Sequence, residues 1–235
     1  MKYYILASVI LFGFLIHRAN KIHRKEHDSE EISFWEKERA ANNVRKKSLD
    51  GLPFISLSNE LQELIKETIR TLQSMQEDQI STKDSDSEIT QDSTKELFSE
   101  EELNSLSECM STLEDLTSKK IVNLTGISNT DLKLEYGTAN ITVLTEYDQN
   151  YTVLARCLNQ WGSFLKKNGQ IPEAKKVLEF AIETKTDISN TYYDLAEIYA
   201  KDLDFSKIEE LNNIAEELPS ANKNAIVRHL QESYL

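Results

Sequence analysis

The sequence predicts a mainly α-helical protein, with a single N-terminal transmembrane helix and a C-terminal domain of antiparallel helix pairs. Three observations support this prediction. An uncharged run occupies residues 3–16, near the start of the chain. Through the body, apolar residues recur at spacings of three and four, the period of one face of an α-helix. In the last third, small residues such as Gly162 and Ala174 occupy positions where two helices would approach closely.

Charge is unevenly divided along the 235 residues, whose formal net charge is −13. Residues 1–50 hold 10 Lys and Arg against 7 Asp and Glu, whereas the remainder holds 17 against 33. Because phosphate contacts require Lys and Arg, the acidic body argues against nucleic acid as a partner. The basic start suits an anionic membrane surface, so we expect residues 1–25 to contact membrane lipid.

Residues 1–17 are expected to form the transmembrane anchor. The uncharged run is short for a span, for which about 17–25 residues are usual, and its length also fits a signal-peptide core. Only Lys2 precedes the run and no small-residue cleavage site follows it, which favours an uncleaved anchor over a cleaved signal. Four cations follow the run: Arg18, Lys21, Arg24 and Lys25. The positive-inside rule then predicts a single-pass cell-membrane protein whose body lies in the cytoplasm.

Residues 18–50 form a basic juxtamembrane segment that we expect to be helical from a capping-box pattern at Asp28 to about Lys47. The adjacent Phe34 and Trp35, together with the basic end of this helix, leave two interpretations. The helix either lies at the lipid interface or is a spacer whose cations stabilise the negative end of its dipole.

Two segments of opposite character follow. Residues 51–76 contain an amphipathic helix that begins at Ser58 or Asn59 and needs a surface to cover its apolar stripe. The stripe comprises Leu61, Leu64, Ile65, Ile69, Leu72 and Met75. Residues 77–96 are nearly all Ser, Thr, Asp, Glu, Gln and Lys. This composition predicts a disordered linker, because it buries too little apolar surface to offset the entropy of ordering.

A helical domain is expected to occupy residues 97–235. A second capping box, in which Glu102 follows Ser99 by three positions, predicts the start of its first helix. Residues 127–137 are expected to form a structured loop with a short strand-like piece at 132–134. A long helix is then expected from about residue 139 to 167, with a break possible at its polar "EYDQN" stretch.

Neither the two cysteines nor the three glycosylation sequons indicates a functional site. Cys109 and Cys157 belong to no Cys-x-x-Cys pair, and we interpret them as small apolar residues within helices. Asn123, Asn140 and Asn150 each begin an Asn-x-Thr sequon. We interpret these three matches as chance, because the pattern is short and a cytoplasmic body is not glycosylated there.

The last third of the chain contains an internal repeat. In "QWGSFLKKNGQIPEAKKVLEFAIE", Gly162 occupies a small position on one helix and Ala174 a small position on the next. A shift of 34 residues places Ala196 on the following first helix, and Ala215 occupies a small position on its second. Residues 155–222 therefore resemble tetratricopeptide repeats (TPRs), which are helix–turn–helix units with a period of 34 residues.

The sequence departs from the TPR pattern at a few positions. Thr186 occupies the place of a closing proline, and Asn212 occupies the place of a large aromatic residue. Two repeats are also fewer than the roughly three that usually make a stable stack. We therefore expect the helix before residue 155, and Ile226 with Leu230 after the repeats, to cap the stack.

The TPR resemblance implies a surface that binds a peptide or a helix on the face formed by the first helices. The outward positions on that face are Arg156, Asn159, Ser163, Tyr193 and Glu197. Ser163, Tyr193 and Glu197 depart from the Lys and Asn combination that binds a C-terminal carboxylate in some TPR proteins, so that mode is not expected. The alternative interpretation of all five residues is solvated surface without a partner.

Together these features predict a membrane-anchored interaction scaffold for a protein or peptide partner. The sequence has no His-Glu-x-x-His pattern, no glycine-rich phosphate loop and no Gly-x-Ser-x-Gly elbow, so we expect no catalytic residues, no cofactor and no metal. The alternative is a structural subunit that braces a membrane complex through its transmembrane helix, and an enzyme is the least favoured class. The layout also resembles bacterial membrane-anchored proteins of uncharacterised function. Nothing in the sequence indicates an oligomeric state.

Overall fold

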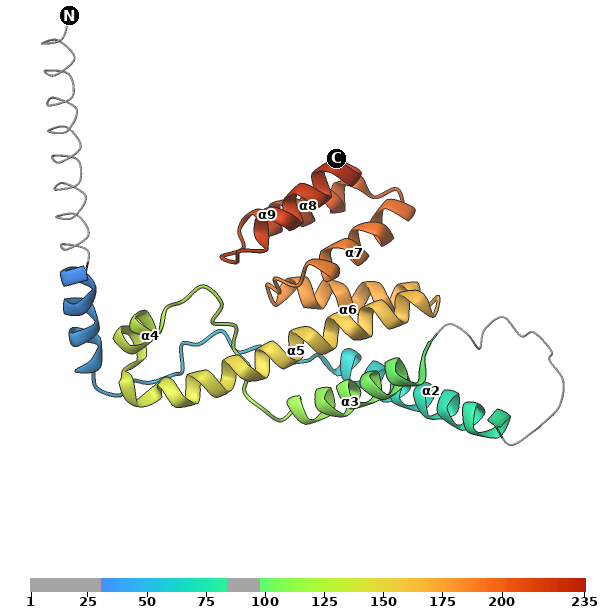
Figure 1. Ribbon diagram of the computed structural model, residues 1–235, viewed down its shortest axis with the longest axis horizontal. Coiled ribbons are helices and arrows are strands. Elements are labelled where there is room, and N and C mark those ends of the chain that lie inside the picture. The colour runs from blue at the N-terminus through green and yellow to red at the C-terminus, as the bar shows by residue number, and fades with distance from the viewer. Residues whose placement is uncertain (1–30, 84–97) are drawn as a thin grey trace, which may run out of the picture. The chain divides into compact units, whose positions relative to one another are not determined.

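The fold is mainly α-helical, as the sequence predicts (Figure 1). The computed structural model describes residues 31–83 and 98–235. A helix over residues 31–42 comes first among them. It is followed by α2 (Asn59–Lys83), α3 (Glu100–Leu116), α4 (Asn129–Tyr136), the 3-10 helix η1 (Thr138–Asn140), α5 (Ile141–Lys167), α6 (Ile171–Glu183), α7 (Ser189–Lys201), α8 (Phe205–Glu216) and α9 (Lys223–Tyr234).

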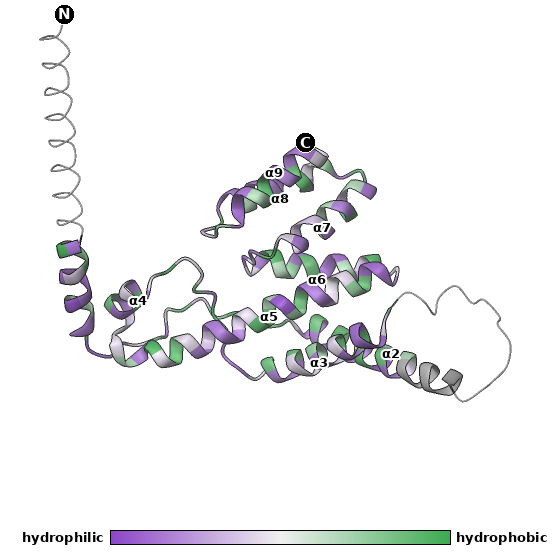
Figure 2. Ribbon diagram, viewed as in Figure 1, coloured by the Kyte–Doolittle hydropathy of each residue, from purple (hydrophilic) through white to green (hydrophobic). Residues whose placement is uncertain are grey.

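The prediction of a transmembrane helix is wrong for the part of the chain that the structure describes. No helix in residues 31–83 and 98–235 is both long enough and apolar enough to cross a membrane. The helices alternate hydrophobic and hydrophilic residues along their length (Figure 2), whereas a spanning helix needs about 20 predominantly apolar residues. The predicted anchor at residues 1–17, and the lipid contacts expected of residues 1–25, lie outside the described residues. The predicted single-pass cell-membrane location with a cytoplasmic body is withdrawn with the transmembrane helix.

The chain divides into two compact units, which we describe separately. Within the described residues, the first unit contains 31–50 and 127–142, and the second contains 51–83, 98–126 and 143–235. Residues 127–142 belong with the segment before residue 51, and α2 belongs with α3 and the C-terminal helices.

In the first unit, the helix over residues 31–42 is held to α4 by polar side chains. Glu38 accepts hydrogen bonds from Thr130, at 2.6 Å, and from Lys133. The backbone N–H of Lys47 donates to the Tyr136 carbonyl at 3.0 Å. The first helix therefore ends before Lys47, earlier than predicted, because the backbone beyond it pairs with the 127–142 segment instead of continuing the helix.

Helix α4 replaces the loop and the strand-like piece that the sequence predicts. The Ser128 side chain caps the helix by accepting a hydrogen bond from the Asp131 backbone N–H. Gly137 ends it with a φ of 88°. A Cβ at Gly137 would lie 2.2 Å from the carbonyl oxygen of Arg45, so the close approach of the two segments requires glycine there. The caps at both ends thus favour a helix more strongly than the Leu-Lys-Leu alternation at residues 132–134 favours a strand.

In the second unit, α5 and α6 form a close antiparallel pair (Figure 1). A Cβ built on Gly162 would lie 2.5 Å from Leu178 Cδ2, so the two helices are in contact where the first lacks a side chain. The sequence predicted this small position but placed Ala174, rather than Leu178, opposite it. Three predicted small positions are fully buried, namely Ala174, Ala196 and Ala215, and so is Ala181. Helix α5 is continuous from Ile141, without the break considered at its polar stretch.

The pairing continues toward the C-terminus. Helix α7 contacts α6, α8 and α9, and α8 contacts α9. Ile226 and Leu230 of α9 are both fully buried, as predicted for a helix that caps the last pair.

Helices α2 and α3 pack against each other and extend the stack at its other end. Trp161 of α5 is fully buried and donates its indole N–H to Thr68 of α2 at 3.0 Å. Gln160 of α5 donates to Ser105 of α3 at 3.0 Å. Lys176 of α6 pairs with α2 through Glu60 at 2.5 Å. Helix α3 therefore lies beside the first helix of the α5–α6 pair, and α2 also reaches its second helix.

Helix α2 continues to Lys83 and so includes the first residues of the segment predicted as a disordered linker. Residues 84–97, the rest of that segment, lie outside the described residues.

The asparagines of the three sequons have structural roles. Each side-chain amide nitrogen donates to a backbone carbonyl: Asn123 to Thr184 at 2.9 Å, Asn140 to Lys47 at 2.8 Å, and Asn150 to Lys120 at 3.0 Å. These contacts tie irregular segments to the helices. The sequence interpretation of chance matches did not anticipate this use.

Candidate functional site

A groove lies along the face formed by α3, α5 and α7. Its volume is about 830 Å³, and all of its lining residues belong to the second unit. Its apolar lining consists of Phe98, Leu106, Phe164 and Ile188. Phe98 and Phe164 are in ring contact, with centroids 4.7 Å apart. The groove thus has an aromatic end where the chain enters α3 and a polar side along α5 and α7.

The five residues predicted to bind a partner are not all in this groove. Arg156, Asn159 and Ser163 of α5 line it. Tyr193 of α7 instead packs against a ring of α9, with its centroid 3.9 Å from that of His229. Glu197 of α7 is engaged in ion pairs with two lysines.

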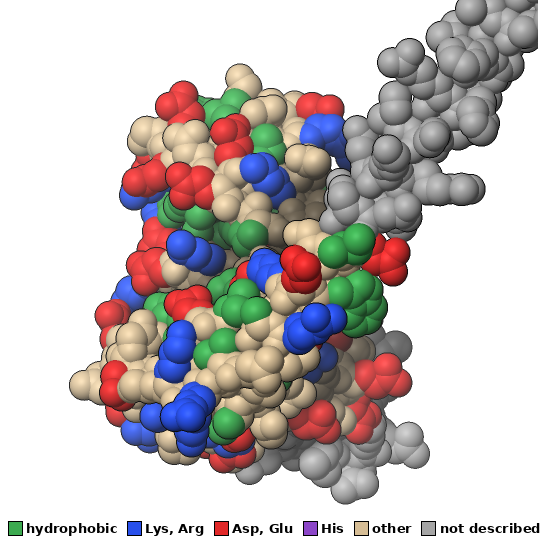
Figure 3. All heavy atoms as spheres, turned by 90° about the vertical axis from the view of Figure 1, so that its left-hand side faces the viewer, with side chains coloured by type: hydrophobic (Ala, Val, Ile, Leu, Met, Phe, Trp, Pro, Cys, Tyr) green, Lys and Arg blue, Asp and Glu red, His purple; other side chains and the backbone are tan. Residues whose placement is uncertain are grey.

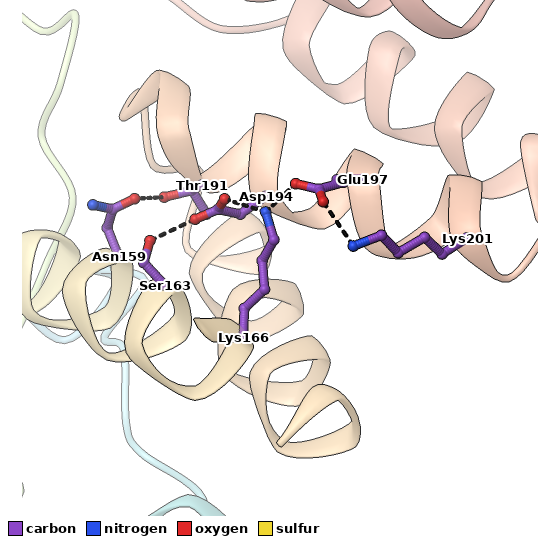
Figure 4. Close-up of polar contacts among 7 residues, drawn as sticks. All are labelled: Asn159, Ser163, Lys166, Thr191, Asp194, Glu197 and Lys201. Carbon is purple, nitrogen blue, oxygen red and sulfur yellow. Dashed lines mark hydrogen bonds and ion pairs between the residues drawn. The ribbon is translucent and has the colours of Figure 1, made fainter. Parts of the chain in front are cut away.

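A row of polar contacts joins α5 to α7 at the groove, and we call it the α5–α7 ladder (Figure 4). Its members are Asn159, Ser163 and Lys166 on α5, and Thr191, Asp194, Glu197 and Lys201 on α7. The Thr191 hydroxyl donates to Asn159 Oδ1 at 3.1 Å, and the Ser163 hydroxyl donates to Asp194. The ladder members on α5 are spaced by three or four residues, and the members of α7 that they contact are spaced by three. Each set therefore lies along one face of its helix.

Lys166 is the centre of the ladder. Its Nζ donates to Asp194 at 2.6 Å and to Glu197, and only 16% of its side chain is exposed. Burial lowers the pKa of Lys166, but the hydrogen bonds to Asp194 and Glu197 outweigh burial and raise it overall. The same contact, followed by that from Lys201, lowers the pKa of Glu197. Both groups are therefore held in their charged forms at neutral pH.

Arg156 differs from the other cations of the groove. It is exposed and makes no ion pair or hydrogen bond with any residue in 31–83 or 98–235. Lys166 is neutralised in the ladder, and Lys167 pairs with Glu102 at 3.4 Å. The Arg156 guanidinium is thus free to bind a group from outside the chain.

Asn159 also retains a free donor. Its Oδ1 is occupied by Thr191, while its amide nitrogen points away from Thr191 in Figure 4. Within the described ranges, that nitrogen makes no hydrogen bond. Two groups of the groove, one on each of two successive turns of α5, can therefore donate outward.

Sequence reasoning missed several groove residues. Lys166 follows Ser163 by three positions on α5, so helical spacing alone indicated that it belongs to the same face. No sequence signal placed Phe98 and Leu106 there, because the packing of α3 on α5 joins residues more than 50 positions apart.

Other parts of the surface are weaker candidates for a binding site. A hollow of about 440 Å³ includes Asn123 and Pro219, but the Asn123 amide already donates to backbone carbonyls. In the described part of the chain, no group of three or more His, Cys, Asp and Glu side chains is placed to hold a metal ion. On the face in Figure 3, acidic and basic side chains are interspersed rather than separated by sign.

No protein-family model, curated protein or solved structure matches this chain. A functional proposal therefore depends on the geometry of the groove and on the sequence pattern.

Proposed function

We propose that this chain is a protein–protein interaction scaffold, without catalytic activity, that binds a peptide or a helix of a partner protein in the groove formed by α3, α5 and α7. The observation that supports this most directly is the exposed, unpaired guanidinium of Arg156 beside an apolar surface. Interaction grooves typically combine apolar contact area with a few polar groups that fix orientation.

The chemistry of the groove specifies the partner segment. A large apolar side chain fits against Phe98 and Phe164, where the groove has aromatic rings. A carboxylate binds Arg156 with two parallel hydrogen bonds, the geometry for which guanidinium is suited. The free amide nitrogen of Asn159 donates to a peptide carbonyl. The preferred partner segment therefore presents Asp or Glu close to a large apolar residue.

The TPR resemblance forms part of this proposal. In it, α5–α6 and α7–α8 are two successive repeats, and α9 is the cap. The 34-residue offset between Gly162 and Ala196, both buried, supports this arrangement. The α2–α3 pair takes the place of a preceding repeat, with its chain order reversed because α3, the later helix, lies beside α5. Three stacked pairs reach the roughly three repeats usually needed for stability.

The test is a selection of peptides from a random display library on the full chain, followed by measurement of Kd for synthetic peptides by fluorescence anisotropy. Arg156→Ala is expected to weaken binding by tenfold or more, because a hydrogen bond to a charged group contributes about 1.5–3 kcal/mol. Arg70→Ala is the matched control, since Arg70 is an exposed arginine on α2, away from the groove lining. It is expected to leave Kd unchanged.

Two results would contradict the proposal. One is a selection that yields no peptide above background. The other is a set of selected peptides that bind the Arg156→Ala variant as tightly as the unmodified chain.

A further inference from the structure

A second groove lies between α2 and α6, and it shares no lining residue with the α3–α5–α7 groove. Its volume is about 490 Å³, and all of its lining residues belong to the second unit. Leu64 of α2 and Phe180 of α6 line it, and both are only partly buried while they pack on the core. The groove therefore leaves apolar side-chain area open to a partner.

This groove continues onto α8. An adjoining hollow of about 310 Å³ lies against α6 and α8, and Glu179 and Glu183 of α6 line both hollows. Ile214 of α8 adds a further partly buried apolar side chain. We call the two hollows together the α2–α6–α8 groove. It extends over three helices, which suits a chain segment better than a small molecule.

Carboxylates dominate the lining. Six glutamates and one lysine line the hollow between α2 and α6, and the hollow at α8 adds one of each. The six glutamates are Glu60, Glu63, Glu67, Glu173, Glu179 and Glu183. The groove is therefore strongly negative around its apolar surface.

Only half of these six carboxylates have a partner within the chain. Lys176 and Lys66 each pair with one glutamate, at 2.5 Å and 2.8 Å, and the Tyr199 hydroxyl donates to a third at 2.7 Å. The other three carboxylates make no ion pair or hydrogen bond with any residue in 31–83 or 98–235; they belong to Glu67, Glu173 and Glu183. These three can therefore bind cationic groups from outside the chain.

The arrangement of the carboxylates excludes a single metal ion as the occupant. Helical spacing places Glu60, Leu64 and Glu67 on one face of α2, and Glu173, Phe180 and Glu183 on one face of α6. Within the ranges that the structure describes, no three acidic, His or Cys side chains converge so as to hold a metal ion. Several cations spaced along a chain match carboxylates that are spread along two helices.

We propose that the α2–α6–α8 groove is a second docking surface, which binds a lysine- or arginine-rich segment of a partner protein. Basic side chains of that segment pair with the unpaired glutamates, and a large apolar side chain between them packs on Leu64 and Phe180. The proposal does not require that the α3–α5–α7 groove bind a peptide. If both grooves are occupied, the chain holds two partner segments of opposite charge.

The experiment selects peptides from a random display library on the full chain carrying Arg156→Ala, so that the α3–α5–α7 groove is impaired. The selected peptides are expected to be rich in Lys and Arg, with Leu, Ile or Phe beside them. Their Kd is measured by fluorescence anisotropy. Glu67→Gln combined with Glu183→Gln is expected to weaken binding by about tenfold or more, because each variant position loses a hydrogen bond to a charged group.

The matched control removes the same charge elsewhere. Glu101→Gln combined with Glu232→Gln changes two exposed carboxylates, on α3 and α9, that line neither groove. At physiological ionic strength, charges farther away than about 8 Å are largely screened, so this control is expected to leave Kd nearly unchanged. Circular dichroism checks that both double variants fold; all four substitutions are at exposed positions.

Three results would overturn the proposal. The first is a selection without an excess of Lys and Arg. The second is equal weakening by the two double variants, which would show that the peptides respond to net charge alone. The third is a free chain that is dimeric by analytical ultracentrifugation and becomes monomeric in Glu67→Gln/Glu183→Gln, which would assign the groove to a second copy of this chain.

Discussion

At the scale of single residues, the contact of α5 with α6 depends on the missing side chain of Gly162. The nearest heavy atoms to a Cβ at that position belong to Leu178, which is fully buried. A leucine in a packed core has little room to move, so an added methyl group forces a shift of one helix relative to the other.

We predict that Gly162→Ala destabilises the protein, although alanine favours helix. The overpacking cost of about 1–3 kcal/mol exceeds the gain of ~1 kcal/mol in helix propensity, which gives a net loss of up to about 2 kcal/mol. Urea unfolding measures this free energy. Gly51→Ala is the control, because no atom lies within 4 Å of a Cβ there. A Gly162→Ala variant that is more stable than the unmodified chain would show that the helices are not in close contact.

Glu197 gives a residue-scale prediction of pH dependence. Its pKa is lowered by Lys166 and then by Lys201, so its contribution to stability is present above its unfolded value of 4.5 and is lost as the pH falls through the lower folded value. The free-energy difference between the unmodified chain and Glu197→Gln is expected to be below about 1 kcal/mol at pH 7, because the group is partly exposed. It is expected to shrink as the pH falls below 4.5.

Denaturant titrations of both chains between pH 3 and pH 7 measure this difference. Glu217→Gln is a suitable control, since Glu217 is exposed and forms no ion pair within residues 31–83 and 98–235. A Glu197→Gln difference that stays constant over the whole range would show that the α5–α7 ladder does not hold the carboxylate charged.

At the scale of helices, one buried polar contact joins α2 to α5. The indole N–H of Trp161 is enclosed by the core and has Thr68 of α2 as its acceptor. A buried donor without an acceptor loses the hydrogen bonds that water would provide, so this contact fixes which part of α2 lies over α5.

Thr68→Val is therefore predicted to destabilise the second unit by about 1–3 kcal/mol, the cost of an unsatisfied buried donor. Thr71→Val tests the same substitution on the same helix, where the hydroxyl bonds only to the Glu67 carbonyl of α2 itself. Combining Thr68→Val with Trp161→Phe gives a double-mutant cycle. A loss in the double variant equal to the sum of the single losses would contradict the contact.

A helix could be predicted from the sequence where the signal lies within that helix alone. The capping box at Ser99, the stripe of α2 and the buried alanines of the last third all follow from local spacing and were found in the structure. The contacts between α3 and α5 were not predictable, because periodicity identifies an apolar face without identifying what covers it. Helical spacing was therefore enough to place Arg156 and Asn159 on an outward face. It was not enough to predict that Phe98, which precedes α3, would line the same groove.

At the scale of the whole second unit, the stack is a series of helix pairs that each cover the next. Such a series leaves an apolar surface at its last pair unless another element covers it. Helix α9 covers α7 and α8 with the fully buried Ile226 and Leu230. Removing the core contacts of α9 is therefore expected to lower the stability of the whole unit, including α7, which lines the groove.

We predict that Leu230→Ala destabilises the unit by about 2–5 kcal/mol, as for other leucines removed from packed cores. Arg228→Ala, an exposed position on the same helix, is expected to change stability by less than about 0.5 kcal/mol. Thermal unfolding followed by circular dichroism checks both values. Equal effects of the two substitutions would indicate that α9 does not pack on the stack.

The most direct test of the proposed interaction surface is to map where a selected peptide binds. A photo-crosslinking amino acid is placed at Asn190, which lines the groove on α7, or at Glu63 on α2, outside the groove lining. The peptide is expected to crosslink efficiently from position 190, and to lose that crosslink when Arg156→Ala is added. A peptide that crosslinks from position 63 and not from position 190 would contradict the assignment of the α3–α5–α7 groove as the binding site.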